Sequence, residues 1–434
     1  MSIKTVTIER LVYGGSGLGR IDGKVAFIPL TLPGEKVEAR IEESKKHYDK
    51  GLILRILDPS PVRIPAPCPY FGRCGGCQWQ HIAYQDQLSF KEDIFRETLA
   101  RIAHVAGEKI LPILPSPVTF GYRNRVRLHV KGGRIGFFAA HSYEIVEIEE
   151  CKIAHSLINR IIKDIKDALP LPSLQKLAGI EVMVSPEEVQ GVLILHTGRP
   201  LSQADENAIR LQSGRIPDIK KCVVQGPGRR LPAQTDFSRE DSLKFFVPEG
   251  DGLTYFLFPG VFAQVNTAQN AILIAKVTEW ADVSSDHKAL DLFCGMGNFT
   301  LPLAKKAKEA TGIETHPLSV KNAVFNKNIN ELDNITFLQE EVAAGIDLLI
   351  REKQCFDLIL LDPPRQGCRD IIKKLPFLKP SRILYISCDP ATLARDINYL
   401  QAEDFDLVRS QPLDMFPQTY HIESLTLFVW KPKN

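Results

Sequence analysis

The residues best suited to do chemistry lie where predicted strands of the C-terminal part end or begin. The apolar run at 383–386 predicts a buried strand, and Asp389-Pro390 ends it because proline has no donor for a strand ladder. Cys388 therefore lies at the carboxyl edge of a sheet, where open α/β folds bind their ligands. A lone cysteine in this place is more often a packing residue, so its neighbours must decide between a core thiol and a nucleophile.

Two carboxylates are expected at the same edge. Asp362 follows the preceding strand and opens a rigid Asp-Pro-Pro-Arg loop, and Glu423 begins the last strand. The last two strands are joined without a helix. The final strand is therefore predicted to be antiparallel and to start at the edge where the parallel strands end. Glu423 can then act as a base beside Cys388, and His421, on the same face of the strand, is a competing base.

A glycine-rich sequence marks another strand end. Residues 291–299, Asp-Leu-Phe-Cys-Gly-Met-Gly-Asn-Phe, follow an apolar strand and open a helix, and the G-x-G lets the backbone approach a ligand closely. Glu314 ends the next strand, where a carboxylate can accept hydrogen bonds from both ribose hydroxyls. The third glycine of the dinucleotide fingerprint is missing, which argues against NAD. The sequence is instead similar to the first motif of S-adenosylmethionine-dependent methyltransferases.

The residue after the two prolines indicates which atom would be methylated. Amino-directed methyltransferases place an aromatic residue there, whereas this chain has Arg365, which favours a ring carbon over an exocyclic amine. The C5 atom of a pyrimidine is not nucleophilic enough to take a methyl group unaided. Addition of the Cys388 thiolate at C6 would make C5 enolate-like, and a base must afterwards remove the C5 proton.

Three cysteines are clustered in one short segment. Cys68, Cys74 and Cys77 have the spacing C-x5-C-x2-C, and Cys151 is the best candidate for a fourth ligand. The chain has nine cysteines, an odd number, and no export signal, so a disulfide framework is not expected. Spacing alone does not separate zinc from an iron–sulfur cluster, although the three-plus-one arrangement favours a cluster.

The chain divides into three predicted parts. Its 434 residues are 44% hydrophobic and 24% charged, with a net charge of +2, and no run of 18 apolar residues or signal peptide is found. We therefore expect a cytoplasmic protein of two or three domains without a membrane partner. Short alternating strands predict a five-stranded OB-like barrel at 1–61, and 62–260 is a mostly β domain that carries the cysteines. Alternating strands and helices at 261–434 predict a doubly wound, Rossmann-like α/β sheet.

A basic stripe in the central part suits RNA. Residues 121–130 alternate, so Arg123, Arg125 and Arg127 are predicted to share one face of a strand, and Lys131 follows. No acidic residue lies between positions 121 and 143. These side chains are our candidate contacts to RNA phosphates, and a solvated edge of a sheet is the equally good alternative.

Together these motifs resemble those of the RNA uracil-5-methyltransferase family. The resemblance rests on the D-L-F-C-G sequence, the D-P-P-R-x-G loop, residues 387–396 and the terminal H-x-E. The N-terminal part resembles a TRAM RNA-binding domain, and the whole chain is similar to the 23S ribosomal RNA branch of the family. The resemblance implies Cys388 as the nucleophile and Glu423 as the proton acceptor.

The same resemblance implies two cofactors, a 4Fe-4S cluster and S-adenosylmethionine. The implied cluster ligands are Cys68, Cys74, Cys77 and Cys151. The implied contacts to S-adenosylmethionine are Gln264, Phe293, Asn298, Glu314, Asp362 and, where the family often has asparagine, Glu341. The family fold also implies that a helix near 82–103 packs on the catalytic domain, although the central domain follows it in the chain.

Two alternatives stay open at this stage. A non-catalytic RNA-binding protein would use the barrel and the cluster, and would bind RNA without transferring a methyl group from labelled cofactor. Within the enzyme class, tRNA is the alternative substrate to 23S ribosomal RNA, because some relatives with similar domains act on tRNA. We expect the protein to work as a monomer.

Overall fold

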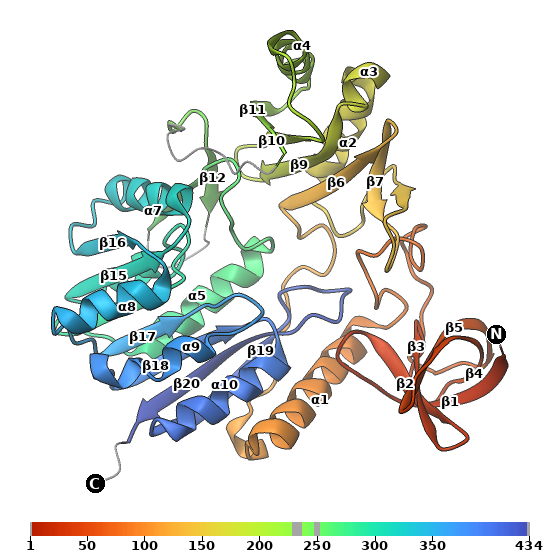
Figure 1. Ribbon diagram of the computed structural model, residues 1–434, viewed down its shortest axis with the longest axis horizontal. Coiled ribbons are helices and arrows are strands. Elements are labelled where there is room, and N and C mark those ends of the chain that lie inside the picture. Colours follow the sequence, from red (N-terminus) through yellow and green to blue (C-terminus); the bar gives the residue numbers. More distant parts are fainter. Residues whose placement is uncertain (1, 228–236, 247–251, 432–434) are drawn as a thin grey trace.

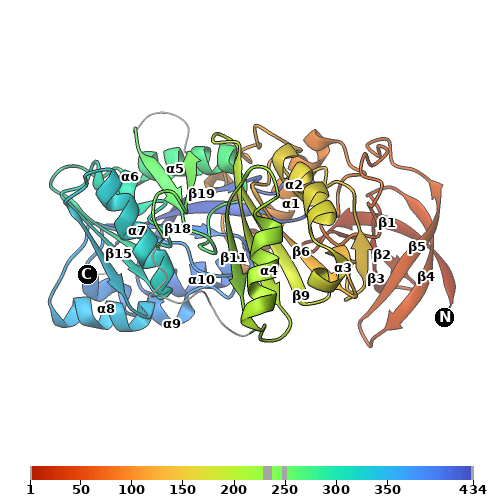
Figure 2. The same ribbon diagram turned by 90° about the horizontal axis from the view of Figure 1, so that it is seen from above.

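The protein consists of a small barrel and two larger sheets. The computed structural model describes residues 2–227, 237–246 and 252–431. The barrel and the C-terminal sheet lie at opposite ends of the molecule (Figure 1, Figure 2). Among the helices in these ranges, none is both long and apolar enough to cross a bilayer.

The N-terminal barrel is closed, with strand order β1-β2-β3-β5-β4. Its strands are β1 (Ile3–Leu11), β2 (Ser16–Ile21), β3 (Lys24–Pro29), β4 (Lys36–Ser44) and β5 (Tyr48–Asp58). Alternate residues such as Val6 and Ile28 fill its interior. A Cβ atom at Gly19 would lie 2.4 Å from the Thr7 carbonyl oxygen, so only glycine lets β1 and β2 approach this closely.

The central sheet has six strands in the order β11-β10-β9-β6-β7-β8, and only β10 and β11 pair in parallel. Its elements are β6 (Arg125–Lys131), β7 (Arg134–Phe138), β8 (Ile145–Glu147), α2 (Ser156–Ala168), α3 (Leu171–Leu174), β9 (Leu177–Ser185), β10 (Gln190–Thr197), α4 (Gln203–Ser213) and β11 (Ile219–Gln225). Isoleucines of α2 share a core with β6, β9 and β10. A hairpin of β12 (Leu243–Phe246) and β13 (Thr254–Leu257) leads to the C-terminal part.

The C-terminal sheet has seven strands in the order β16-β15-β14-β17-β18-β20-β19. Its strands are β14 (Lys288–Leu292), β15 (Glu309–Glu314), β16 (Ile335–Gln339), β17 (Leu358–Leu361), β18 (Arg382–Ser387), β19 (Phe405–Leu413) and β20 (Glu423–Trp430). The helices are α5 (Thr267–Ala281), α6 (Thr300–Ala304), α7 (Pro317–Ile329), α8 (Val342–Arg351), α9 (Arg369–Ile372) and α10 (Pro390–Ala402), with 3-10 turns at Gly107–Lys109 and Leu375–Leu378. β20 is antiparallel to both β18 and β19, as the missing helix before it predicted.

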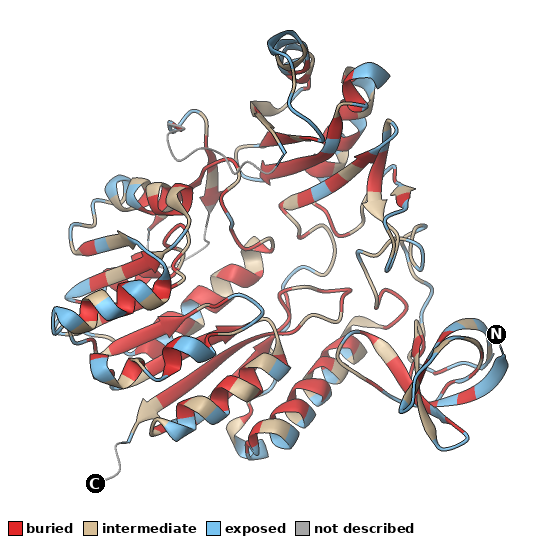
Figure 3. Cartoon of the chain, in the orientation of Figure 1, coloured by how far each residue is buried: buried red, intermediate tan, exposed pale blue. Residues whose placement is uncertain are grey.

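Helices cover both faces of this sheet, whose central strands β14, β17 and β18 are buried (Figure 3). One face packs against α5 and α6, and the other packs against α8, α9 and α10. Helix α1 (Tyr84–Ala103) joins the second face: Phe95 and Leu99 share a core cluster with Leu393 and Ile397 of α10. The segment after α1 also runs beside β19, where Ile110 bridges Ser410. In sequence order, α1 and the segment after it thus join the C-terminal layer before the chain enters the central sheet.

Candidate active site

The three residues expected to do chemistry meet at one edge of the C-terminal sheet. Asp362 follows the last residue of β17, and Cys388 follows the last residue of β18. β20 begins at Glu423, and its register pairs Ser424 with Ser387. Glu423 and Cys388 are the residues that follow this last pair at the sheet edge, and the charge of Glu423 is the second cause, after burial, of the raised Cys388 pKa.

Cys388 lies in a tightly bonded turn. The Asp389 carboxylate accepts a hydrogen bond from the Thr392 backbone N–H at 2.8 Å and so caps α10. The Ser387 hydroxyl accepts from the Asp389 N–H at 3.2 Å. Pro390 stands at the first turn of the helix, where its missing N–H costs nothing. The thiol is thereby presented between a strand end and a helix start.

The Asp-Pro-Pro-Arg loop is tied to the same helix by Asp396. This buried carboxylate accepts hydrogen bonds from the Tyr385 hydroxyl at 2.7 Å and from the Cys368 N–H at 2.9 Å. A Cβ atom at Gly367, where φ is +78°, would lie 2.3 Å from the Asp396 carboxylate. The loop therefore packs against α10 without a side chain at this position.

Burial opposes negative charge at this edge. Glu423 is 4% exposed, and its pKa is raised well above the ordinary value by desolvation and then by Asp362, while Arg365 opposes the shift. Desolvation also raises the pKa of Cys388 to about 12, with a smaller contribution from Glu423, and Arg365 lowers it. Arg365, which the sequence suggested only as a sign of the acceptor atom, is thus the cation that favours the thiolate.

His421 stays a second candidate base. Burial, with Arg365 next, lowers its pKa to about 4, so its imidazole is neutral near pH 7 and can accept a proton. Its ring lies 4.3 Å from the Tyr420 ring and 5.7 Å from the Phe416 ring, measured between centroids. Desolvation raises the pKa of Asp362 to about 7.

The glycine turn after β14 forms a cradle for a nucleoside ligand. Phe293, Gly295 and Gly297 have φ values of +68°, +56° and +87°, and a Cβ atom at Gly295 would meet nothing within 4 Å. The Glu314 carboxylate accepts from the Gly295 N–H at 3.1 Å and from the His316 N–H at 2.7 Å, which holds it at the end of β15. An open turn beside a fixed carboxylate suits the adenosine part of S-adenosylmethionine.

The other predicted cofactor contacts differ in their surroundings. Asn298 and Asn270 exchange two amide hydrogen bonds, at 2.9 and 3.0 Å, so the Asn298 side chain has a defined orientation. Gln264 is 8% exposed and precedes α5. Glu341 is exposed, and its carboxylate caps α8 by accepting from the Ala344 N–H at 3.2 Å. Glu341 therefore has a structural role that the sequence did not indicate.

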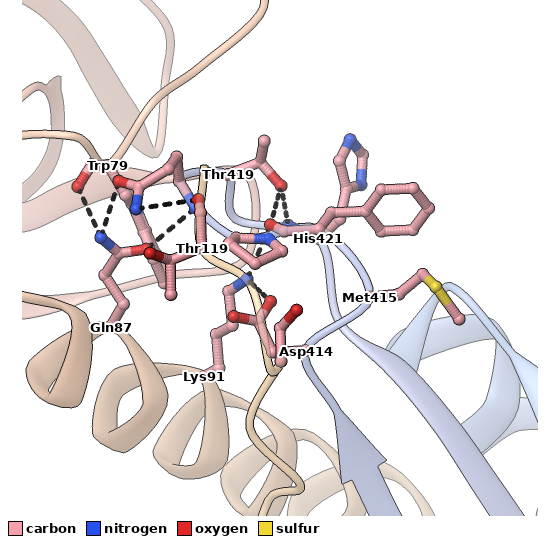
Figure 4. A network of polar contacts seen from close by, with 12 residues as sticks. Trp79, Gln87, Lys91, Thr119, Asp414, Met415, Thr419 and His421 are labelled. Carbon is pink, nitrogen blue, oxygen red and sulfur yellow. Dashed lines mark hydrogen bonds and ion pairs between the residues drawn. The ribbon is translucent and has the colours of Figure 1, made fainter. Parts of the chain in front are cut away.

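Helix α1 fixes the segment that leads into Glu423. Lys91 donates to the Asp414 carboxylate at 2.6 Å and to the Phe416 carbonyl at 3.1 Å. The Gln87 amide donates to the Gln418 side-chain oxygen at 3.0 Å, and the Gln418 N–H donates back to Gln87 at 3.0 Å. Figure 4 shows Gln87 and Lys91 reaching from α1 toward the segment that carries Asp414 and His421. Sequence reasoning missed this network.

The four predicted cluster cysteines line one cavity of about 260 Å³. The lining also includes Tyr70, Val126 and Phe137. Within the ranges that the structure describes, no three His, Cys, Asp or Glu side chains lie close enough to hold a single metal ion. The four cysteines thus share one cavity, and the cluster expected there stays a prediction.

The residues of the predicted basic stripe have different surroundings in the structure. Arg123 lies before β6, and its guanidinium lines the cysteine cavity, 5.9 Å from the Phe416 ring centre, so the prediction that it lies on the strand was wrong. Arg125 pairs with Glu181 at 2.7 Å. Arg127 and Lys131 are exposed on β6. Arg123 forms part of the wall of the cysteine cavity, and the alternating pattern in the sequence does not reveal this position.

A family model described as tRNA (Uracil-5-)-methyltransferase matches residues 83–431, and a TRAM domain model matches residues 2–54. The chain belongs to the tRNA (uracil-5-)-methyltransferase family. Like this family, it is an S-adenosylmethionine-dependent RNA uracil-C5 methyltransferase. The predicted family, TRAM domain and fold class are thereby confirmed, whereas the roles assigned to single residues stay predictions.

Relatives in this family span nearly the whole chain. An uncharacterized RNA methyltransferase of Aquifex aeolicus is 37% identical over 431 residues, 97% of either chain. The 23S rRNA (uracil(1939)-C(5))-methyltransferase RlmD of Aeromonas salmonicida is 35% identical, covering 97% of this chain and 95% of its own. The crystal structure of Pyrococcus abyssi tRNA (uracil-54, C5)-methyltransferase with S-adenosyl-L-homocysteine has a TM-score of 0.74 at 25% identity, and covers 98% of this chain and 100% of its own.

Proposed function

We propose that this enzyme methylates C5 of a uracil in 23S ribosomal RNA through a covalent adduct of Cys388. The observation that carries the proposal is that three strand ends meet at one sheet edge: Asp362 follows β17, Cys388 follows β18, and Glu423 begins the adjacent antiparallel β20. A nucleophile and a base at one edge suit addition and elimination on opposite ends of one C5–C6 bond.

The proposed reaction passes through a bond between the Cys388 sulfur and C6 of the uracil. The Cys388 thiol loses its proton to solvent, with Arg365 favouring the thiolate, and the sulfur forms a bond to C6 of the uracil. Bound S-adenosylmethionine would supply the methyl group that C5 receives. Burial favours the neutral form of Glu423, so its own proton must first leave to solvent; the carboxylate then takes the C5 proton while the C6–S bond breaks and the thiolate leaves. The raised pKa of Glu423 makes its carboxylate a stronger proton acceptor than a surface carboxylate.

RNA that carries 5-fluorouracil tests this mechanism. Fluorine cannot leave as a proton, so the wild type should form a stable protein–RNA adduct that denaturing gels detect. Cys388→Ala should form none. Glu423→Gln should instead accumulate an adduct with ordinary RNA, because methylation proceeds and elimination stalls. An undiminished adduct with Cys388→Ala would refute the assignment of the nucleophile.

The choice of 23S ribosomal RNA is supported by the relatives. Those named as 23S rRNA methyltransferases match at 33–35% identity over nearly the full length, whereas the tRNA enzyme of known structure matches at 25%. Methylation of unmodified ribosomal RNA and tRNA, isolated from a strain without the gene, followed by mapping of 5-methyluridine, decides between them. Methyl transfer to tRNA alone would favour the alternative.

We also propose a 4Fe-4S cluster on Cys68, Cys74, Cys77 and Cys151, which line one cavity. The cysteine loop is bonded to the β7–β8 hairpin, since the Gly75 N–H donates to the Phe138 carbonyl at 3.0 Å. The cluster would therefore hold an RNA-binding surface in place. Iron and sulfide analysis tests its presence. Cys74→Ala should weaken RNA binding, and a folded variant that lost only chemistry would contradict this role.

The proposed RNA surface is the exposed side of β6 and β7. Arg127 and Lys131 are exposed there, and the His129 ring stacks on Phe138 at 3.6 Å. Tyr143, 81% exposed, lies edge-on to Phe138. Cations beside aromatic rings suit phosphates and unpaired bases. Arg127→Gln should weaken binding to all RNAs and reduce the salt slope by about one ion.

The three-part domain division, the monomeric state and the cytoplasmic location stay predictions.

A further inference from the structure

The barrel touches the catalytic turn directly. Tyr13 lies in the turn between β1 and β2, and its hydroxyl donates a hydrogen bond to the Cys388 carbonyl oxygen at 3.2 Å. Its ring meets the Tyr420 ring edge-on, with centroids 5.5 Å apart and an interplanar angle of 86°. The RNA-binding domain thus contacts both the proposed nucleophile and the segment that leads into Glu423.

The rest of the turn is held from a second side. The indole N–H of the fully buried Trp79 donates to the Gly15 carbonyl at 3.3 Å. At Gly15, where φ is +86°, a Cβ atom would lie 3.1 Å from the Tyr420 ring and 3.3 Å from Gln78. The backbone N–H groups of Gln78 and Trp79 both donate to the Gln418 carbonyl, each at 3.1 Å. Residues 78–79 therefore contact the barrel turn from one side, and the 418–420 segment contacts it from the other.

The Cys388 carbonyl needs such a partner. The ladder between β18 and β20 ends at Ser387 and Ser424, so Cys388 lies one residue beyond the strand bonds that fix β18. The peptide unit between Cys388 and Asp389 is held at its N–H by the Ser387 hydroxyl, and Tyr13 supplies the donor for its carbonyl oxygen. Burial and the nearby Asp389 raise the pKa of Tyr13 above its ordinary value, so the phenol stays protonated and remains a donor.

We propose that Tyr13 is a positioning residue that completes the active site from the barrel by holding the Cys388 backbone in the orientation for attack on C6. This inference rests on the proposed covalent role of Cys388. The bond forms between the Cys388 sulfur and C6 of the uracil as described above, and Tyr13 neither gains nor loses a proton. Misplacement of a reacting atom by about 1 Å can cost on the order of 100-fold in rate, so one hydrogen bond at this carbonyl is enough to matter.

Tyr13→Phe tests the hydrogen bond alone, because the ring and its contact with Tyr420 are kept. We expect the rate of adduct formation on 5-fluorouracil RNA, at saturating RNA, to fall about tenfold. The dissociation constant for RNA and the KM for S-adenosylmethionine should stay within about twofold of wild type. Tyr48→Phe, a substitution of another barrel tyrosine whose ring lies against Phe27, is the matched control and should leave the rate unchanged.

The outcomes separate the inference from the proposed function. A wild-type rate with Tyr13→Phe, while wild-type enzyme forms the adduct, overturns the positioning role and leaves the mechanism intact. A loss of rate that tracks a loss of RNA affinity also overturns it, since Tyr13 would then bind RNA. Absence of an adduct with wild-type enzyme refutes the covalent mechanism, and the role of Tyr13 falls with it. A lower rate with unchanged affinity and an unchanged melting temperature supports the inference.

Discussion

Replacing Lys91 by methionine should destabilise the layer that joins α1 to the catalytic sheet. The Lys91 ammonium lies 2.6 Å from the Asp414 carboxylate, and both side chains are 0% exposed. Burial lowers the pKa of Lys91, and Asp414 opposes the shift. Methionine fills a similar volume, but it leaves a carboxylate without its cation where water does not reach.

The size of the effect follows from the burial. Removing one partner of a buried ion pair costs about 3–5 kcal/mol, because the remaining charge loses its compensation. Because the Lys91 and Asp414 side chains are both 0% exposed, solvent does not screen the charge that remains. Against a typical unfolding free energy of about 5–15 kcal/mol, the loss is a large fraction, and for 434 residues that unfold as one unit it corresponds to a fall in melting temperature of roughly 3–5 °C.

Urea unfolding of the full chain measures this loss. Tryptophan fluorescence is a suitable signal, since the buried Trp79 ring lies 5.8 Å from the Lys91 ammonium. The matched control is Lys374→Met, which removes an ion pair with Asp347 of 2.8 Å whose side chains are 31% and 53% exposed. Exposed pairs contribute about 0–1 kcal/mol, so the control should be close to wild type.

A second substitution separates charge from packing. Asp414→Asn in the Lys91→Met background removes the uncompensated charge and should restore more than half of the lost stability. The reasoning is refuted if Lys91→Met costs no more than Lys374→Met, or if the double variant is as unstable as the single one. Below its melting temperature, Lys91→Met should also have a lower kcat, because Lys91 holds the Phe416 carbonyl in the segment before Glu423.

Other substitutions give sharper tests of the site. Arg365→Gln should raise the pKa of Cys388 further and lower the adduct rate at saturating RNA about threefold, by the same factor at every pH below about 12; an unchanged rate would contradict the role of this cation. Glu341→Ala should cost about 1 kcal/mol of stability as a lost helix cap and leave the KM for S-adenosylmethionine unchanged, whereas Glu314→Ala should raise that KM at least tenfold; equal effects on KM would show that Glu341 binds the cofactor. Gly297→Ala should weaken cofactor binding, measured by calorimetry, because φ there is +87°.

The predictions from local pattern were accurate where a residue is constrained by its immediate neighbours. The strands predicted before the glycine turn, Glu314, Asp362 and Cys388 are β14, β15, β17 and β18, and β20 is antiparallel because no helix intervenes before it. The turn after β14 was readable because Gly295 and Gly297 adopt positive φ, which few other residues tolerate.

One error arose where a residue serves a distant part of the chain. Arg123 continues the alternation of β6 in the sequence, yet the strand starts at Arg125, and Arg123 lines the cysteine cavity near Phe416. Glu341 also caps α8 through the nearby Ala344 N–H, and its expected contact with the cofactor stays a prediction.

The sequence by itself determined the family, the order of strands and helices and the set of reactive side chains, because motif spacing and hydrophobic period are local properties. Only the tertiary structure decided which of these side chains act on one another. Tyr13 and Cys388 are 375 positions apart, and Lys91 and Asp414 are 323 apart. Such contacts depend on how the barrel and α1 pack against the catalytic sheet, and buried hydrogen bonds and ion pairs of this kind leave no periodic trace in the chain.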